Sequence, residues 1–237
     1  MGTPDSSNQP HGAAQVSARV WDLPVRLFHW TLVALLAFQL FSGKTGGNWM
    51  QWHGYAGYTI LALVLFRILW GFAGSTTARF SSFLAGPARA VEFLRRLVRR
   101  EPVAHASHNP LGGWMVVVLL AALLVQAGTG LFANDDIATE GPLARHISKD
   151  LSDRLTTIHY WNLNFILALV AAHVAAVLFH WRVLKENLIG AMFTGDKLLP
   201  ADLAREVAAA RTASSWRALA LVAVAAAAVY VIVKPVV

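Results

Sequence analysis

The sequence predicts an all-α integral membrane protein, built as a four-helix transmembrane bundle with a fifth transmembrane helix near the C-terminal end. Of the 237 residues, 56% are hydrophobic and only 14% are charged, and the mean hydropathy is +0.50. Soluble domains carry about 25% charged residues. Several unbroken apolar stretches approach or exceed the ~20 residues that a helix needs to cross the hydrocarbon core. The composition therefore excludes an ordinary soluble enzyme, a collagen-like chain and a disordered chain.

The first predicted span covers residues 23–41. Asp22 is placed to cap its N-terminus, and Pro24 lies in its first turn, where a missing amide hydrogen costs nothing. A short glycine-containing turn separates it from the second span. The same criterion of length and hydropathy predicts the other spans at 49–72, 111–132, 155–181 and the alanine-rich 218–233.

The chain divides into three parts around these spans. Residues 1–19 are polar and turn-rich and predict a disordered N-terminal tail, without the charged region and cleavage site of a signal peptide. Residues 20–197 hold the first four spans as one transmembrane domain. Residues 198–237 form a linker and the fifth span, whose alanine-rich surface would also suit contacts in an oligomer.

The loop between the second and third spans is rich in arginine and carries apolar residues at helical spacing. This pattern predicts a short helix lying on the membrane surface, with a solvated loop as the alternative. The apolar positions are Ala90, Val91, Leu94, Leu97 and Val98.

The distribution of positive charge predicts the orientation in the membrane. Fourteen Lys and Arg residues lie in the segments on the N-terminal side of the membrane, and five lie on the other side. The positive-inside rule then places the N-terminus in the cytoplasm. The family resemblance described below implies that the membrane is the inner membrane of a bacterium. The net charge of +7 is therefore read as attraction to anionic lipid, and nucleic acid is not expected as a partner.

The chain has no cysteine and nine histidines. It can hold no disulfide, no iron–sulfur cluster and no CxxCH haem attachment, so a redox metal would need ligands other than thiolates. Ionisable residues inside membrane spans are costly and usually functional. The histidines within the spans are His29, His53, His159, His173 and His180.

Helical geometry pairs four of these histidines. His159 and His173 are 14 residues apart, which places them on nearly one face of the fourth span with ~21 Å of rise between them. His29 lies at the cytoplasmic depth of His173, and His53 at the outer depth of His159. His180 is too close to the end of its span to match His29.

Two imidazoles on facing helices can hold a haem iron with no open coordination site, which suits electron transfer. Small residues near them could make room for a planar macrocycle, or could only let the helices approach closely. They are Gly54, Gly57, Gly128, Gly130, Ala171 and Ala172. The histidines could instead form interhelical hydrogen bonds, or serve a proton or metal-ion transporter without haem. A transporter path would need carboxylates, and the spans contain no buried Asp or Glu. A bare membrane anchor would not need histidines matched by depth.

Two arginines could neutralise a haem propionate through charge-assisted hydrogen bonds. Arg67 lies inside the second span, a few residues from its cytoplasmic end, so it could alternatively extend to the lipid headgroups. Arg26 lies near the start of the first span and is the second candidate.

With these features, the chain resembles the bacterial cytochrome b561 family, which includes the cytochrome b subunit of nickel–iron hydrogenases. The matching stretches are VWDLPVRLFHW, WHGYAGYTILALVLFRILWGF, HNPLGGWMVVVLL, QAGTGLF, IHYWNLNFILALVAAHVAAVLFH and ENLIGAMFTGDK. The resemblance implies that residues 20–197 form a four-helix bundle with two b-type haems. It maps the ligands to His29, His53, His159 and His173, in agreement with the pairing by depth.

The resemblance also implies a function. It predicts electron transfer across the membrane between quinone and a periplasmic redox partner, such as a c-type cytochrome or a hydrogenase-like subunit. The chain would be an electron-carrier subunit of an oxidoreductase, and quinone oxidoreductase activity of its own remains open. In related formate dehydrogenase subunits a quinone binds near the inner haem at the start of the third helix, where this sequence has Asn109 and Gly112. A plain helix-start turn is the alternative there. His108 could supply a proton at this position, although a solvated loop histidine is the expectation.

Overall fold

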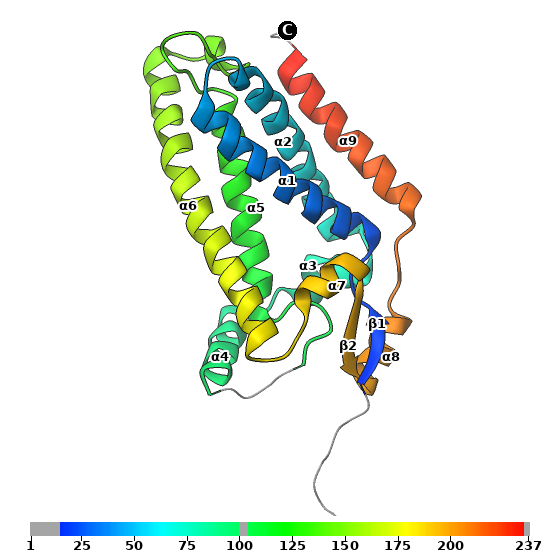
Figure 1. Cartoon of the computed structure of the whole chain (residues 1–237). Coiled ribbons are helices and arrows are strands. Elements are labelled where there is room, and N and C mark those ends of the chain that lie inside the picture. The colour runs from blue at the N-terminus through cyan, green and yellow to red at the C-terminus, as the bar shows by residue number, and fades with distance from the viewer. Residues whose placement is uncertain (1–14, 100–103, 235–237) are drawn as a thin grey trace, which may run out of the picture.

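The computed structural model describes residues 15–99 and 104–234. Within them, five helices are long and apolar enough to cross a membrane, which confirms the predicted fold class. Their bounds are α1 (Leu23–Thr45), α2 (Trp49–Ala73), α5 (Pro110–Gly130), α6 (Lys149–Arg182) and α9 (Ser215–Val233). They run roughly along one direction (Figure 1).

The helix starts follow from local capping. Asp22 caps α1 as predicted, and its carboxylate accepts the backbone N–H of Val25 at 2.9 Å. Helix α6 begins at Lys149, six residues before the predicted start of the span. Ser148 caps it, and an ion pair between Asp150 and Arg154 joins side chains one turn apart, so the charged segment stays helical.

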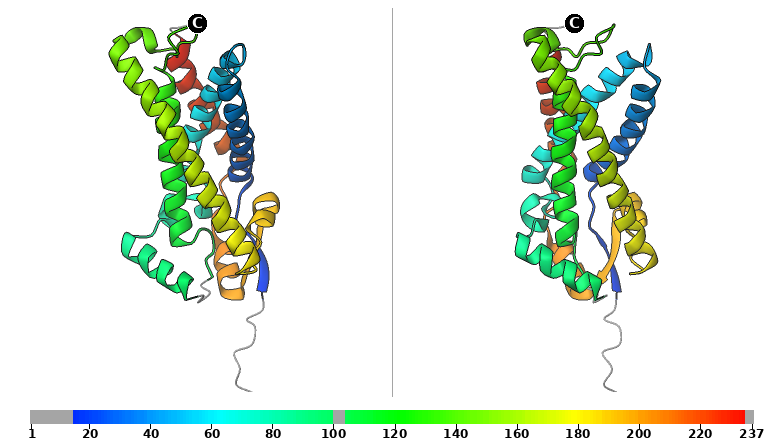
Figure 2. Two further views of the ribbon diagram at one scale, coloured as in Figure 1. Left: turned by 60° about the vertical axis from the view of Figure 1, so that its left-hand side comes forward. Right: turned by 90° about the vertical axis from the view of Figure 1, so that its left-hand side faces the viewer.

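The helices form two layers joined in the middle. Helix α1 packs on α2, α5 packs on α6, α2 packs on α5, and α9 lies against α2 on the side away from α6 (Figure 1). Among the described residues, α1 and α6 do not pack on each other along their lengths, and their ribbons lie apart in Figure 2. Hydrophobic side chains bridge this separation, because Leu32 and Leu36 of α1 and Leu169 and Val170 of α6 pack against one cluster that contains Ile166.

A small extramembrane unit covers one end of the bundle, called here the sheet end. Strands β1 (Gln15–Arg19) and β2 (Asp196–Pro200) pair antiparallel, from Gln15 opposite Pro200 to Arg19 opposite Asp196. Helix α8 (Ala201–Ala209) packs on both strands, and α7 (Leu188–Thr194) leads into β2. The predicted disorder is therefore wrong for residues 15–19, and residues 1–14 of that tail lie outside the described part of the chain.

The arginine-rich loop also lies at the sheet end. It contains the short helices η1 (Thr76–Ala78) and α3 (Phe80–Phe83), and then α4 (Pro87–Val98). Helix α4 confirms the predicted amphipathic helix. It buries Ala90 and Phe93 and leaves Val98 exposed.

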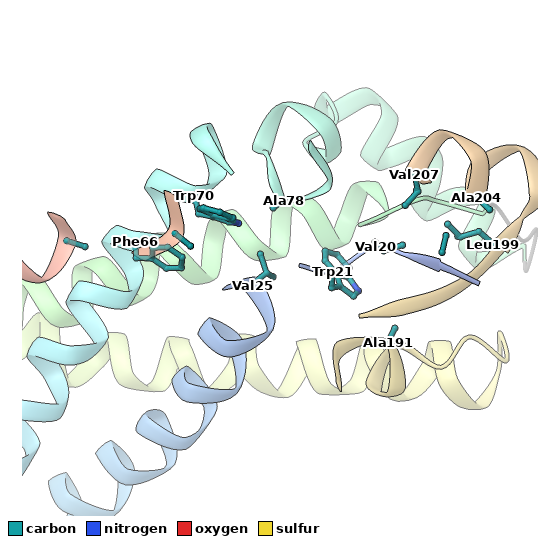
Figure 3. Packing of buried hydrophobic residues seen from close by; sticks show 13 residues of the cluster. Val20, Trp21, Val25, Phe66, Trp70, Ala78, Ala191, Leu199, Ala204 and Val207 are labelled. Atoms are coloured by element: carbon teal, nitrogen blue, oxygen red, sulfur yellow. The ribbon is translucent and has the colours of Figure 1, made fainter. Parts of the chain in front are cut away.

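A hydrophobic cluster fixes the sheet end to the bundle (Figure 3). Trp21, just before α1, and Val25 in its first turn pack with Phe66 and Trp70 of α2 and with Leu199 of β2. Trp70 is fully buried, and its Nε1–H donates to Asp22 at 3.0 Å. The N-terminal segment, α2 and the segment after α6 therefore share one core.

The opposite end of the bundle carries the turn between α1 and α2 and the loop that contains η2 (Ala144–His146). Acidic side chains of this loop are paired locally. Lys149 bridges Asp136 and Asp153, with 2.6 Å to each.

Candidate functional site

The structure brings together the two histidine pairs that depth and helix face predict. The rings of His29 in α1 and His173 in α6 have centroids 6.5 Å apart, with 56° between their planes. The rings of His53 in α2 and His159 in α6 have centroids 6.4 Å apart, with 69° between their planes. The first pair is nearer the sheet end and the second nearer the opposite end.

These separations fit one metal atom between each pair. Two imidazoles that coordinate a metal from opposite sides place their nitrogens about 2 Å from it, and each ring centroid lies ~1.2 Å behind its nitrogen, which gives about 6.4 Å between centroids. Rings in direct stacking contact would lie closer, down to about 4.5 Å. Within the described residues, no group of three or more His, Cys, Asp or Glu side chains gathers as a metal cluster. Each site is therefore a pair of imidazoles.

Hydrogen bonds fix the tautomers of the pair at the opposite end. His159 Nδ1 lies 2.9 Å from the carbonyl oxygen of Gln126 in α5, and a carbonyl can only accept, so this nitrogen carries the proton. His53 Nδ1 lies 3.1 Å from Ser42 Oγ, whose own hydrogen is directed to the Phe38 carbonyl at 2.8 Å. His53 Nδ1–H therefore donates to Ser42. In both rings Nε2 keeps its lone pair for a metal.

Glycines make room for these two rings. A Cβ atom on Gly130 would lie 3.0 Å from Cε1 of His159, and one on Gly43 would lie 3.1 Å from Cε1 of His53. Gly128 has nothing within 4 Å of the corresponding position, and Gly54 meets only the Tyr58 side chain at 3.7 Å. Gly130 is thus the one among the predicted glycines that lies against a paired histidine, and Gly43 was missed by sequence reasoning.

The pair at the sheet end has fewer protein partners. His29 Nδ1 is buried and has no hydrogen-bond partner among the described residues. The edge of its ring meets Trp30, with 4.9 Å between centroids. His180 does not compete with His173 for the place beside His29. It lies at the end of α6, where its Nδ1 is 2.7 Å from Glu186 Oε2.

His180 belongs to a buried polar network at the sheet end. Its Nε2 lies 3.3 Å from the amide nitrogen of Asn109, and the other carboxylate oxygen of Glu186 is 2.7 Å from Lys197 Nζ. Burial would raise the pKa of Glu186, but the hydrogen bonds and charges of His180 and Lys197 outweigh it and lower that pKa to about 2. Lys197 also donates to the backbone carbonyl of His105 at 2.9 Å. The network ties α6, β2 and the segment before α5 together.

Asn109 and Gly112 lie at the start of α5, close to this network. Asn109 caps the helix, because its Oδ1 accepts the N–H of Gly112 at 2.7 Å. The backbone N–H of Gly112, expected to be free for a ligand, is therefore used by the cap. Asn109 has a second amide hydrogen besides the one that faces His180.

The two arginines lie at the sheet end without a full set of partners. Arg67 is only 3% exposed, so it does not extend to the lipid headgroups, and its guanidinium lies 5.3 Å from the centre of the Phe80 ring. Its Nη1 has no hydrogen-bond partner among the described residues. Arg26 Nη1 donates to the Phe193 carbonyl, and its buried Nε is likewise without a partner in the described part of the chain. Buried donors in this state need an acceptor.

Comparison with known proteins identifies the family. A family model described as prokaryotic cytochrome b561 matches residues 20–195. Neither a curated protein nor a solved structure gives a significant match. The matched region runs from the start of the shared core through all four histidine-bearing positions to the end of α7. Since the match covers most of the chain, the protein belongs to the prokaryotic cytochrome b561 family of membrane-spanning, haem b-binding electron-transfer proteins.

Proposed function

We propose that the chain is a di-haem cytochrome b, in which His29 and His173 hold an inner haem and His53 and His159 hold an outer haem. The observation that carries this proposal is the spacing of the two ring pairs, 6.5 and 6.4 Å, each suited to one iron atom. Helix α6 supplies one ligand to each pair, ~21 Å apart along its axis. Two such groups would span most of the ~30 Å hydrocarbon core.

A haem held by a histidine pair would supply a reversible one-electron iron couple. Residues of the chain set the protonation state and the position of the imidazoles that would hold it. Gln126 and Ser42 hold His159 and His53 with Nε2 unprotonated, which strengthens these nitrogens as ligands. Gly130 and Gly43 leave space for the rings.

Arg67 and Arg26 would bind haem propionates. The support is the buried nitrogen that each keeps without a hydrogen-bond acceptor among the described residues. A carboxylate satisfies such a donor and offsets the cost of burying its charge.

We further propose that the inner haem exchanges electrons with membrane quinone at the sheet end, and the outer haem with a periplasmic redox protein. Asn109 would offer its second amide hydrogen to a quinone carbonyl, beside Gly112, while His180 holds the first. The cytoplasmic placing of the sheet end follows from the positive-inside rule. The sheet end contains the arginine-rich α4 and the basic segments that follow α6 (Figure 1).

The direct test is the difference spectrum, reduced minus oxidised, of the purified protein with pyridine haemochrome quantification. Two haems b are expected per chain. His29→Ala and His173→Ala are expected to lose the same haem, and His53→Ala and His159→Ala the other. His146→Ala, at the exposed η2 turn, is the matched control and keeps both.

A different grouping of losses would overturn the pairing. Loss of the inner haem in His180→Ala but not in His173→Ala would transfer the ligand role to His180. A folded wild type without haem, from cells that supply haem, would contradict the electron-transfer function. The quinone site is tested by reduction of the inner haem with a soluble quinol. Asn109→Leu is expected to slow this reduction at least tenfold, while dithionite still reduces both haems.

A further inference from the structure

His108 lies in an enclosed position that none of the roles above uses. It comes directly before Asn109, and its ring is held between Trp21 and Phe83, with 4.6 and 4.5 Å between ring centroids. Its Nδ1 is buried and has no hydrogen-bond partner among the described residues. The expected solvated loop histidine is thus a packed one with an unused polar atom.

Arg67 acts on His108 electrostatically and also has a buried nitrogen without a hydrogen-bond partner among the described residues. A row of aromatic rings joins the two residues. The Arg67 guanidinium lies over Phe80, Phe80 contacts Phe83 at 5.8 Å, and Phe83 contacts His108. The charge of Asp22 acts on Arg67, but its two carboxylate oxygens accept from Val25 N–H and Trp70 Nε1–H. Arg67 Nη1 itself has no hydrogen-bond partner among the described residues.

The charges around His108 favour an anion. Arg67, Lys197 and His173 all act on it electrostatically. Burial and these charges lower the pKa of His108 to about 3, so its ring is neutral at physiological pH. Lys197 is neutralised by Glu186 at 2.7 Å, whereas no carboxylate hydrogen-bonds to Arg67 in the described part of the chain. One positive charge is left without a hydrogen-bonded counter-ion beside a neutral imidazole.

We propose that His108 and Arg67 bind one carboxylate together, a propionate of the inner haem, with His108 Nδ1–H as the second donor. This inference rests on the proposed function, since it assumes a haem between His29 and His173. Arg67 supplies the charge. His108 sets the orientation of the carboxylate, because Trp21 and Phe83 fix the plane of the ring that donates to it. His108 is a positioning residue for the haem and not a ligand to iron.

The test uses variants that separate the hydrogen bond from the packing. His108→Phe keeps an aromatic ring between Trp21 and Phe83 but removes the donor. His108→Asn places an amide near the position of Nδ1, and His108→Gln places it near that of Nε2. Two readouts are measured on the intact protein: the resonance Raman propionate bending band, and the midpoint potential of the haem that His173→Ala removes.

We expect His108→Phe and His108→Gln to shift the propionate band and to lower the midpoint potential of the inner haem only. An ionised propionate that loses a donor carries a less compensated negative charge, which favours ferric iron. His108→Asn is expected to match the wild type in both readouts. His146→Phe, at the opposite end of the bundle, is the control for the substitution itself.

Unchanged values in both the Phe and Gln variants would overturn the proposal, and so would an Asn variant that behaves like Gln. If the Phe variant does not fold, the comparison of the Asn with the Gln variant still tests whether a donor at the Nδ1 position binds the propionate. A wild type without haem at His29 and His173 would instead contradict the proposed function. A wild type with both haems and no effect of His108 would contradict this inference alone.

Discussion

His159 donates a hydrogen bond from Nδ1 to the backbone carbonyl of Gln126 in the facing helix, with 2.9 Å between nitrogen and oxygen. A backbone acceptor is a firm support, because no side-chain substitution at residue 126 removes it. The bond holds the imidazole of α6 against α5 and directs Nε2 toward His53 in α2. Ser42 does the same for His53 from α1. Helices α1 and α5 thus orient the histidine pair that α2 and α6 carry.

Ser42→Ala tests this support from the α1 side. The substitution removes the acceptor of His53 Nδ1–H, so the ligand nitrogen becomes less basic and the ferric state less favoured. We expect the midpoint potential of the outer haem to rise while that of the inner haem stays constant, as followed by redox titration of the visible spectrum. Thr45→Ala is the control, because Thr45 bonds only to a carbonyl of its own helix. Equal shifts of both haems in Ser42→Ala would contradict the assignment.

Much of the bundle could be predicted because its signals are local. Length and hydropathy located all five spans, and Asp22 marked the first helix start correctly. The proximity of His29 to His173 and of His53 to His159 followed from helix periodicity and depth alone. For a membrane-spanning helix, the sequence indicates both the face on which a residue lies and its depth in the bilayer. For a helix of a soluble protein it indicates only the face.

The parts that sequence reasoning missed depend on contacts distant in the chain. Strand β1 is only five residues long and exists because it pairs with β2, some 180 residues later. His108 looked like a loop residue because nothing near it in sequence reveals that Trp21 and Phe83 enclose it. Ser42 carried the signal of a polar residue near the end of a span, but only the fold shows that it faces His53.

Asp22→Ala tests the core of the sheet end. Asp22 caps α1 and also accepts from the fully buried Trp70, so its loss removes a cap and leaves a buried N–H unpaired. A cap contributes about 1 kcal/mol, and an unsatisfied buried donor costs about 1–3 kcal/mol, so a destabilisation of about 2 kcal/mol or more is expected. Thermal unfolding in detergent, followed by tryptophan fluorescence, measures it. Ser214→Ala, which removes only the cap of α9, is expected to have a smaller effect. Equal losses in the two variants would show that Trp70 does not depend on Asp22.

Glu186 should make stability depend on pH in the acid range. Its pKa is lowered to about 2 in the folded protein by His180 and Lys197, against about 4.3 in an unfolded chain. The stabilisation is therefore fully present above the unfolded value, and it is lost as the pH falls from there toward 2. Glu186→Gln should lower the midpoint of thermal unfolding at neutral pH and flatten its decline in this window. A decline of the same steepness in wild type and variant would assign the acid sensitivity to another group.

Gly130 and Gly128 offer the sharpest test of the outer site, because they lie two residues apart in α5 and differ in one respect. A Cβ atom at 130 would lie 3.0 Å from His159 Cε1 and 3.3 Å from its Nδ1, whereas at 128 it would meet nothing within 4 Å. Gly130→Ala is therefore expected to displace the His159 ring, weaken its bond to Gln126 and lower the content of the outer haem severalfold. Gly128→Ala should keep both haems, since the two substitutions change helix propensity equally. Pyridine haemochrome content and the difference spectrum give the answer. If both variants kept two haems with unchanged spectra, the α5 surface would have no part in holding His159.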